Sequence, residues 1–289
     1  MFWKKKQPKK QQILPSNEGS ICYSASMSSK KENEDTFVNL SVNGLHLFAV
    51  ADGLGSYSAA ADASRYAIDF IRKNADKITP DRAVLSQIFQ DIASNLHRLA
   101  EDDKYKGKDR ENLLGTTLIV GIESAEEVTF AYLGNGAIIH VRGSIGDFPQ
   151  KNDPWYAVSL LNPHTVPEKG KEALYRLLSD DESVNVKPTI ISVSKDDSLG
   201  DAFIICTDGI YSADQIELFR HQQIGLLIKF DEHLLSLYDL LRKLQSDETD
   251  NRAETLKTEA DLFLESNKAK FDDDATLAIL LTSKFYKKK

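Results

Sequence analysis

Short apolar runs separated by tight turns recur along most of this chain and limit the folds open to it. Three such runs, residues 115–122, 128–133 and 137–142, follow one another with turns of only a few residues. Connections this short join antiparallel strands, because a parallel pair needs a long crossover. Similar runs elsewhere predict further strands at 21–26, 36–43, 45–51, 155–161, 189–194, 202–206 and 275–282.

Helical periodicity is confined to separate parts of the chain. Apolar residues recur at helical spacing over residues 59–74, and Thr79-Pro80 opens a second helix that runs to about Asp102. Weaker patterns predict helices at 171–178, 213–229, 232–246 and 252–267.

The order of these elements predicts an α+β protein. Antiparallel strand runs with segregated helices favour a four-layer αββα sandwich, in which helices flank two stacked antiparallel sheets. We expect one domain over residues 19–284, between a flexible basic tail at 1–18 and a second basic tail at 285–289.

The charge distribution excludes some classes of partner. The 289 residues carry a net charge of −8, although lysines crowd both ends of the chain, and such an acidic body should repel nucleic acid and anionic membranes. The basic tails are either solvated or a weak electrostatic tether to lipid or to an acidic partner. No run of 18 apolar residues is present, and we expect no secretory signal. Cys22 and Cys206 are interpreted as buried free thiols. We therefore expect a cytoplasmic protein, and a monomer.

Four acidic turns stand at the ends of apolar strand runs. The clearest is Asp52-Gly53 in the stretch LFAVADGLGSYS, where a buried strand delivers an acid to a glycine-rich turn. The other three turns are Glu34-Asp35, Asp208-Gly209 and Asp272–Asp274. Strand ends on one edge of a sandwich can converge, and a cluster of like charges persists where cations neutralise it. The absence of neighbouring His and Cys favours Mg²⁺ or Mn²⁺ over zinc.

Two such ions predict a particular chemistry. Together they can bind and deprotonate a water, which then attacks phosphorus in line. The sequence therefore indicates a metal-dependent hydrolase of phosphate esters.

Five motifs in order resemble the protein phosphatase 2C family, the metal-dependent Ser/Thr phosphatases, over residues 20–283. The motifs are Lys30 to Asp35, Asp52-Gly53-Leu54-Gly55-Ser56 with Ala63-Ser64 in the next helix, Gly115-Thr116-Thr117, Thr207-Asp208-Gly209, and Asp273-Asp274-Ala275-Thr276. The resemblance is to the bacterial type, in which a histidine in the second motif is often absent.

The resemblance implies a set of metal ligands. Glu34, Asp52 and the Gly53 carbonyl would hold one ion, and Asp52, Asp208 and Asp273 the other. Asp35 would act mainly through a metal-bound water. Asp272 is a rival for Asp273, but the threonine three residues after Asp273 favours the latter.

Three departures from the family pattern affect the expected chemistry. Lys30 stands where the family has a phosphate-binding arginine, so it keeps the charge and loses the bidentate geometry. Asn135 replaces an aspartate that can help to hold a third ion; alternatively, it only caps its turn. His164 has one family-like neighbour, and we interpret it as a surface or loop-packing residue.

The resemblance implies a protein Ser/Thr phosphatase with two Mg²⁺ or Mn²⁺ ions, which acts on a phosphoprotein and has a cognate Ser/Thr kinase as its expected partner. Two alternatives stay open. The first is a pseudophosphatase that keeps the fold as a binding module, and the second is a phosphatase of small phosphate esters.

Overall fold

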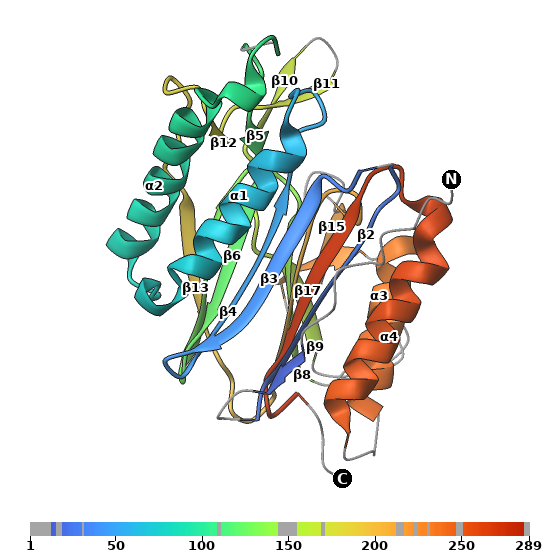
Figure 1. Ribbon diagram of the computed structural model, residues 1–289. Coiled ribbons are helices and arrows are strands. Elements are labelled where there is room, and N and C mark those ends of the chain that lie inside the picture. Colours follow the sequence, from blue (N-terminus) through green and yellow to red (C-terminus); the bar gives the residue numbers. More distant parts are fainter. Residues whose placement is uncertain are drawn as a thin grey trace, which may run out of the picture.

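The computed structural model describes residues 13–15, 19–30, 32–108, 111–143, 155–168, 171–211, 217–221, 225–229, 232–246 and 251–285. Two antiparallel sheets dominate it (Figure 1). The five-stranded sheet has the order β13 (Thr189–Ser194), β7 (Glu127–Leu133), β6 (Leu118–Glu123), β4 (Leu45–Asp52), β3 (Asp35–Val42). The six-stranded sheet has the order β1 (Ile13–Pro15), β2 (Ile21–Met27), β17 (Ala275–Leu281), β14 (Asp201–Cys206), β8 (Ala137–Gly143), β9 (Trp155–Ser159).

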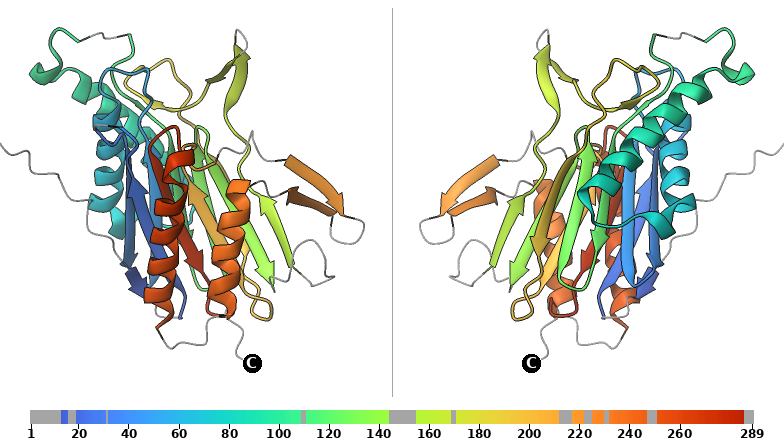
Figure 2. Two further views of the ribbon diagram at one scale, coloured as in Figure 1. Left: turned by 90° about the vertical axis from the view of Figure 1, so that its right-hand side faces the viewer. Right: turned by 90° about the vertical axis from the view of Figure 1, so that its left-hand side faces the viewer.

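Helices cover the outer face of each sheet. α1 (Ala60–Lys73) and α2 (Arg82–Ala100) lie on the five-stranded sheet, and α3 (Glu232–Ser246) and α4 (Arg252–Asn267) lie on the six-stranded one (Figures 1 and 2). Three separate hydrophobic cores result, one under each helix pair and one between the sheets. The predicted αββα sandwich is confirmed.

Strand β4 is buried on both faces, which explains why its sequence is almost entirely apolar. Leu47, Ala49 and Ala51 point into the core beneath α1 and α2, whereas Phe48 and Val50 point into the core between the sheets. A strand buried on both faces has no polar alternation to show. It can therefore hold its last residue, Asp52, at a fixed depth.

Aromatic rings fill the core between the sheets. Phe130 meets Phe48 edge-on at a centroid separation of 6.2 Å and lies 5.6 Å from Phe203 of the opposite sheet. A Cβ atom on Gly121 would lie 2.3 Å from the Phe48 ring, so the glycine makes room for that ring. These contacts set the spacing of the two sheets.

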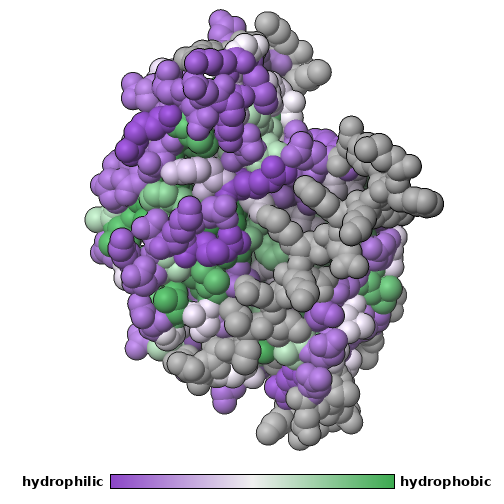
Figure 3. Space-filling view, viewed as in Figure 1, coloured by the Kyte–Doolittle hydropathy of each residue, from purple (hydrophilic) through white to green (hydrophobic). Residues whose placement is uncertain are grey.

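The first two helices follow their sequence patterns with one adjustment. α1 buries Ala63, Ala67 and Ile71 against the five-stranded sheet. The predicted N-terminal signal of α2 at Thr79-Pro80 is displaced, because Asp81 is the capping residue and accepts hydrogen bonds from two backbone N–H groups of the first turn. Hydrophilic side chains predominate on the outer surface of this helical layer (Figure 3).

Two predicted helices are wrong. Residues 171–178 supply β11 (Lys171–Leu174), which pairs with β10 (Thr165–Glu168) in a hairpin, and β12 (Leu178–Ser179), which pairs with β5 (Gly115–Thr116). Residues 213–229 supply a second hairpin, β15 (Glu217–His221) with β16 (Gly225–Lys229). An eight-residue helix is marginal without tertiary support, and Gly225 disfavours helix in the second segment.

The terminal segments fall mostly outside the described residues. Within the expected N-terminal tail, residues 13–15 form β1 at the edge of the six-stranded sheet, whereas 1–12, 16–18 and the C-terminal 286–289 are not described. Short 3₁₀ turns occur at Ala75–Lys77, Asp103–Tyr105 and Lys268–Lys270. Among the described helices, none combines the length and the apolar character needed to cross a membrane.

Candidate metal centre

The acidic turns predicted from the sequence converge at one edge of the sandwich. In the five-stranded sheet, the register places Asp35 directly opposite Asp52. In the six-stranded sheet, β14 ends beside the start of β17, with Cys206 opposite Leu277. The antiparallel topology thus brings acids far apart in the sequence to adjacent strand ends.

Gly115-Thr116-Thr117 holds the turn that carries Asp52. The Thr116 hydroxyl and the Thr117 N–H donate to the Asp52 carbonyl at 2.7 and 2.8 Å, and the Leu54 N–H donates to the Gly115 carbonyl at 3.0 Å. These bonds fix the backbone of the Asp52-Gly53 turn while leaving its carboxylate unconstrained by them.

The Asp208 turn packs against the turn of Asp272–Asp274. A Cβ atom on Gly209 would lie only 1.9 Å from the carbonyl oxygen of Asp274, so this contact requires glycine. The close approach explains why a glycine follows Asp208, and it brings Asp208 and Asp273 to the same edge.

Three carboxyl groups crowd together at the centre of the site. The side chain of Asp52 lies within hydrogen-bonding reach of both Asp35 and Asp208. Burial, and then the negative charges of Asp35 and Asp208, raise the pKa of Asp52 well above its usual range. Burial likewise raises the pKa of Asp35. A group of acids arranged this way needs protons or cations.

One oxygen of Asp35 lacks a donor among the described residues. Its Oδ2 accepts a hydrogen bond from the Thr207 hydroxyl at 2.7 Å, whereas the buried Oδ1 accepts none there. A buried carboxylate oxygen without a donor is costly, which fits an ion or an ordered water at this point.

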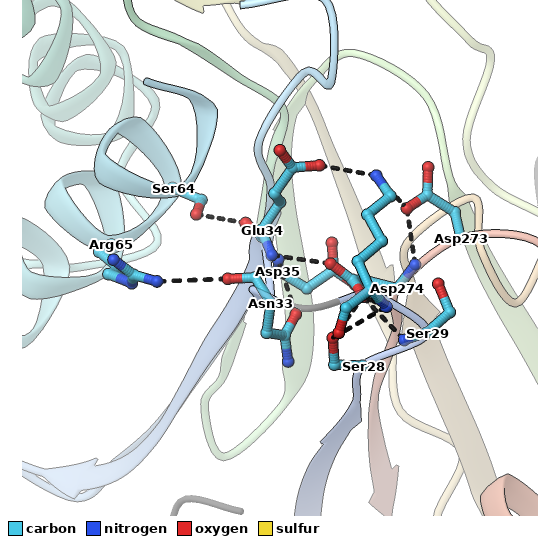
Figure 4. A network of polar contacts seen from close by, with 10 residues as sticks. Ser28, Ser29, Asn33, Glu34, Asp35, Ser64, Arg65, Asp273 and Asp274 are labelled. Atoms are coloured by element: carbon cyan, nitrogen blue, oxygen red, sulfur yellow. Dashed lines mark hydrogen bonds and ion pairs between the residues drawn. The ribbon is translucent and has the colours of Figure 1, made fainter. Parts of the chain in front are cut away.

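Glu34 and Asp273 form a second acidic group near Asp35 (Figure 4). Lys30 Nζ lies 2.6 Å from Glu34 Oε2 and 2.6 Å from Asp273 Oδ1. A Cβ atom on Gly55 would lie 3.6 Å from both Glu34 Oε2 and Lys30 Nζ, so this ion pair sits against the turn that follows Asp52. The structure thus engages Lys30 with two of the predicted metal ligands.

Asp274 is a residue whose role the sequence interpretation missed. It is buried, and its Oδ1 accepts from the Ser28 hydroxyl and the Ser29 N–H at 2.8 and 2.9 Å, while its Oδ2 accepts from the Glu34 N–H at 2.7 Å (Figure 4). One oxygen each of Glu34, Asp273 and Asp274 lie within 4.8 Å of one another. Backbone N–H groups engage both oxygens of Asp274, whereas the Asp274 N–H engages only Oδ1 of Asp273, at 2.6 Å. The run of three aspartates, Asp272–Asp274, was the only sequence signal for a role of Asp274. The first of the three, Asp272, is exposed.

Helix α1 fixes the loop that carries Glu34. The Ser64 hydroxyl donates to the Glu34 carbonyl, and the Arg65 guanidinium donates to the Asn33 carbonyl at 3.4 Å (Figure 4). The same guanidinium donates to Glu32 at 2.8 Å. The serine that follows Ala63 in the helix therefore positions a proposed ligand through its backbone.

Asn135 contacts the acidic cluster directly. Its side-chain amide donates to Asp208 Oδ2 at 2.8 Å. An amide at this place neutralises no charge but orients one oxygen of Asp208.

His164 is a packing residue in this structure, and it is not on the surface. It is buried against Tyr132, with ring centroids 5.1 Å apart, and its Nδ1 accepts from the Gly134 N–H. Burial, and then the charge of Arg176, lower its pKa to about 4, so that it is neutral at pH 7. It supports the loop next to Asn135.

The donor set fits Mg²⁺ or Mn²⁺. Its members are all oxygen donors, the carboxylates of Glu34, Asp52, Asp208 and Asp273 and the Gly53 carbonyl, as these hard cations prefer. The crowding of carboxyl groups around Asp52 and the Asp35 oxygen without a donor among the described residues also favour a bound cation.

The chain is similar to known proteins both in its sequence and in its fold. Residues 24–258 match the family model described as protein phosphatase 2C, whereas no curated protein matches the chain. The matched region includes the first four motifs and ends before Asp273, which the fold brings to the same edge.

Several solved structures share the fold. A mutant of a bacterial serine phosphatase superposes with a TM-score of 0.63 at 15% identity, covering 93% of this chain and 99% of that one. Stp1, the serine/threonine phosphatase of Staphylococcus aureus, has a TM-score of 0.60 at 15% identity, with 94% and 98% covered. The catalytic domain of the phosphatase PstP, in complex with two manganese ions, has a TM-score of 0.56 at 18% identity, with 91% and 98% covered.

The family model spans more than half of the chain, and the structural likeness extends over more than nine-tenths of it. The sequence motifs, the two-sheet sandwich and the acidic edge agree with both findings. The chain belongs to the protein phosphatase 2C family.

Proposed function

We propose that this protein is a metal-dependent protein Ser/Thr phosphatase. The observation that carries the proposal is the convergence of Asp52, Asp208, Glu34 and Asp273 at one edge, from four separate parts of the chain. Phosphomonoester hydrolysis needs a strong nucleophile and positive charge around the phosphoryl oxygens, and this donor set suits cations that supply both.

The residues have distinct roles in the proposed site. Glu34, Asp52 and the Gly53 carbonyl would hold one ion, and Asp52, Asp208 and Asp273 the other. When bound, the ions would supply an acidified water as nucleophile and positive charge opposite the phosphate. Asp35, whose Oδ1 lacks a donor among the described residues, would accept a hydrogen bond from water in the site.

Phosphoserine and phosphothreonine in proteins are the proposed substrates, and a Ser/Thr kinase is the corresponding partner. Family membership supports this class, as do the serine/threonine phosphatases that share the fold. Small phosphate esters would use the same chemistry.

A second candidate function rests on Lys30. Its ammonium group pairs with Glu34 and Asp273, two of the proposed metal ligands. A protein cation that takes the place of a metal ion in this way would suit a pseudophosphatase, which keeps the fold without turnover. Both candidates predict the same fold, and they differ in turnover.

Turnover with and without metal tests the proposal. We expect release of phosphate from a phosphothreonine peptide and from an aryl phosphate in Mn²⁺, and its loss in excess EDTA. Readdition of Mn²⁺ should restore it. Hydrolysis that continues unchanged in EDTA would exclude the metal mechanism, and no hydrolysis at any Mn²⁺ concentration would favour the pseudophosphatase.

Asn135 leads to a prediction about the number of ions. We expect the wild type to bind two Mn²⁺, because an amide lacks the charge that holds a weaker third ion. Asn135→Asp places a second carboxylate beside Asp208 Oδ2, at the position from which the amide now donates at 2.8 Å. Two adjacent carboxylates repel unless a cation lies between them. Isothermal titration calorimetry should show an additional weak binding event, and activity should rise at millimolar Mn²⁺.

Asn135→Ala is the control for that experiment, since it removes the donor without adding charge. It should bind no additional ion. Three ions in the wild type, or none gained in Asn135→Asp, would show that residue 135 only shapes its turn.

A further inference from the structure

The side chain of Lys30 occupies the space between two proposed metal ligands that come from different sheets. Glu34 precedes β3 of the five-stranded sheet, and Asp273 precedes β17 of the six-stranded sheet. The Lys30 ammonium group lies 2.6 Å from an oxygen of each. A single cation therefore joins the two sheets at the site.

The backbone of Lys30 is fixed as well, so this contact is not that of a freely moving surface lysine. Ser28 Oγ accepts from the Lys30 N–H at 3.2 Å and donates to the Lys30 carbonyl at 2.9 Å. The single proton of that hydroxyl is shared with Asp274 Oδ1, which lies at 2.8 Å from Ser28 Oγ, and Asp274 is adjacent to Asp273. The turn that carries Asp273 thus also anchors the residue that pairs with it.

Lys30 is also close to the turn of the central acid. An added Cβ on Gly55 would lie 3.6 Å from both the ammonium nitrogen and Glu34 Oε2, which places the ion pair over the Asp52-Gly53 turn. A divalent ion coordinated by Glu34 or Asp273 would take oxygens that the ammonium group now holds, and would repel it.

We infer that Lys30 is a built-in counter-cation, which neutralises Glu34 and Asp273 before metal binds and is displaced when metal binds. The inference rests on the proposed metal site. Displacement lowers the apparent metal affinity and releases a lysine beside the ions, where its charge can meet the phosphate of the substrate. Lys30 is thus a positioning residue for the apo site.

Calorimetric titration of the full chain with Mn²⁺ tests the inference without measuring activity. Lys30→Met keeps the side-chain length and removes the charge. Its side chain and those of Glu34 and Asp273 are partly exposed, so each ion pair is worth little, and we expect Mn²⁺ to bind about five- to tenfold more tightly to the variant. The melting temperature of the metal-free variant should fall, and Mn²⁺ should raise it more than it raises that of the wild type.

Two control variants separate charge from other effects. Lys30→Arg keeps the cation and should bind Mn²⁺ no more tightly than the wild type. Lys243→Met removes a similar ion pair, Lys243 with Glu259 at 2.9 Å between α3 and α4, and should leave the Mn²⁺ affinity unchanged.

Chemical labelling supplies an independent measure. Reductive methylation followed by mass spectrometry should show faster modification of Lys30 with Mn²⁺ than without, and no such change at Lys243. Two results would overturn the inference while leaving the proposed function intact. The first is that Lys30→Met binds Mn²⁺ no more tightly than the wild type, and the second is that Mn²⁺ does not change the rate at which Lys30 is labelled. If neither the wild type nor Lys30→Met bound Mn²⁺, both the inference and the proposed function would be overturned. If only Lys30→Met bound Mn²⁺, Lys30 would be a permanent counter-cation, which would overturn its displacement by metal and refute metal use by the wild type.

Discussion

Asp52→Asn should lower kcat/KM by at least about 1000-fold at saturating Mn²⁺, equivalent to about 4 kcal/mol of transition-state stabilisation. Asp52 is the one acid proposed to serve both ions, and its side chain lies within hydrogen-bonding reach of Asp35 and Asp208. An amide keeps the shape of the side chain and one oxygen, but it cannot neutralise two divalent cations. Steady-state hydrolysis of an aryl phosphate measures the loss.

The same substitution should stabilise the metal-free protein. Burial and two neighbouring carboxylates raise the pKa of Asp52, which shows that its negative charge is unfavourable when no cation is present. Removing that charge therefore raises the melting temperature in EDTA. Opposite effects on activity and stability identify a residue kept for function.

Asp239→Asn is a matched control for charge. Asp239 is an exposed residue of α3 that pairs with Arg242 at 3.1 Å, and its neutralisation should change neither activity nor melting temperature by a measurable amount. Wild-type turnover by Asp52→Asn would refute the two-metal assignment, whatever its stability.

The largest effect on stability is expected from Asp274→Ala. The buried carboxylate of Asp274 accepts hydrogen bonds from Ser28, Ser29 and Glu34, and so joins the turn before β17 to the segment between β2 and β3. Its loss removes three hydrogen bonds to a buried charged acceptor from partly buried donors, which should lower the free energy of unfolding by about 3–5 kcal/mol. Urea denaturation in EDTA measures this without the contribution of bound metal.

Two further variants test the cause of that loss. Asp274→Asn keeps one acceptor oxygen for Ser28 and Ser29 but loses the acceptor for the Glu34 N–H, so about half of the effect should remain. Asp272→Ala, at the exposed neighbour, should change the free energy of unfolding by less than about 0.5 kcal/mol. Equal stability of Asp274→Ala and Asp272→Ala would show that the carboxylate contacts are unimportant.

The fold was predictable because its central strands, such as β4 and β17, are apolar over most of their length and many of its turns are short. β4 and β17 are buried on both faces, so their sequences are recognisable without any knowledge of their partners. Their ends then placed Asp52 and Asp273 at an edge, and the antiparallel order of the strands brought the acids to the same one.

Other features depend on tertiary contacts that no local pattern reveals. Residues 171–178 carry a helical period, yet pairing between Val166 and Ala173 makes a hairpin. The roles of Asp274 and Lys30 depend on contacts with segments some 240 residues away, the Glu34 N–H for Asp274 and the Asp273 carboxylate for Lys30. Sequence spacing indicated the carboxylates and could not show their counter-cation.

The division of the site between two sheets makes it sensitive to how the sandwich is packed. Asp35 and Asp52 move with one sheet and Asp208 with the other, while the rings of Phe48, Phe130 and Phe203 determine the gap between them. A strand advances about 3.3 Å per residue, more than the length of a bond from oxygen to Mg²⁺, so slippage by even a fraction of a residue would separate the donors. The affinity for metal should therefore depend on how the core between the sheets is packed. Substitutions in that core, far from any carboxylate, should change the dissociation constant for metal.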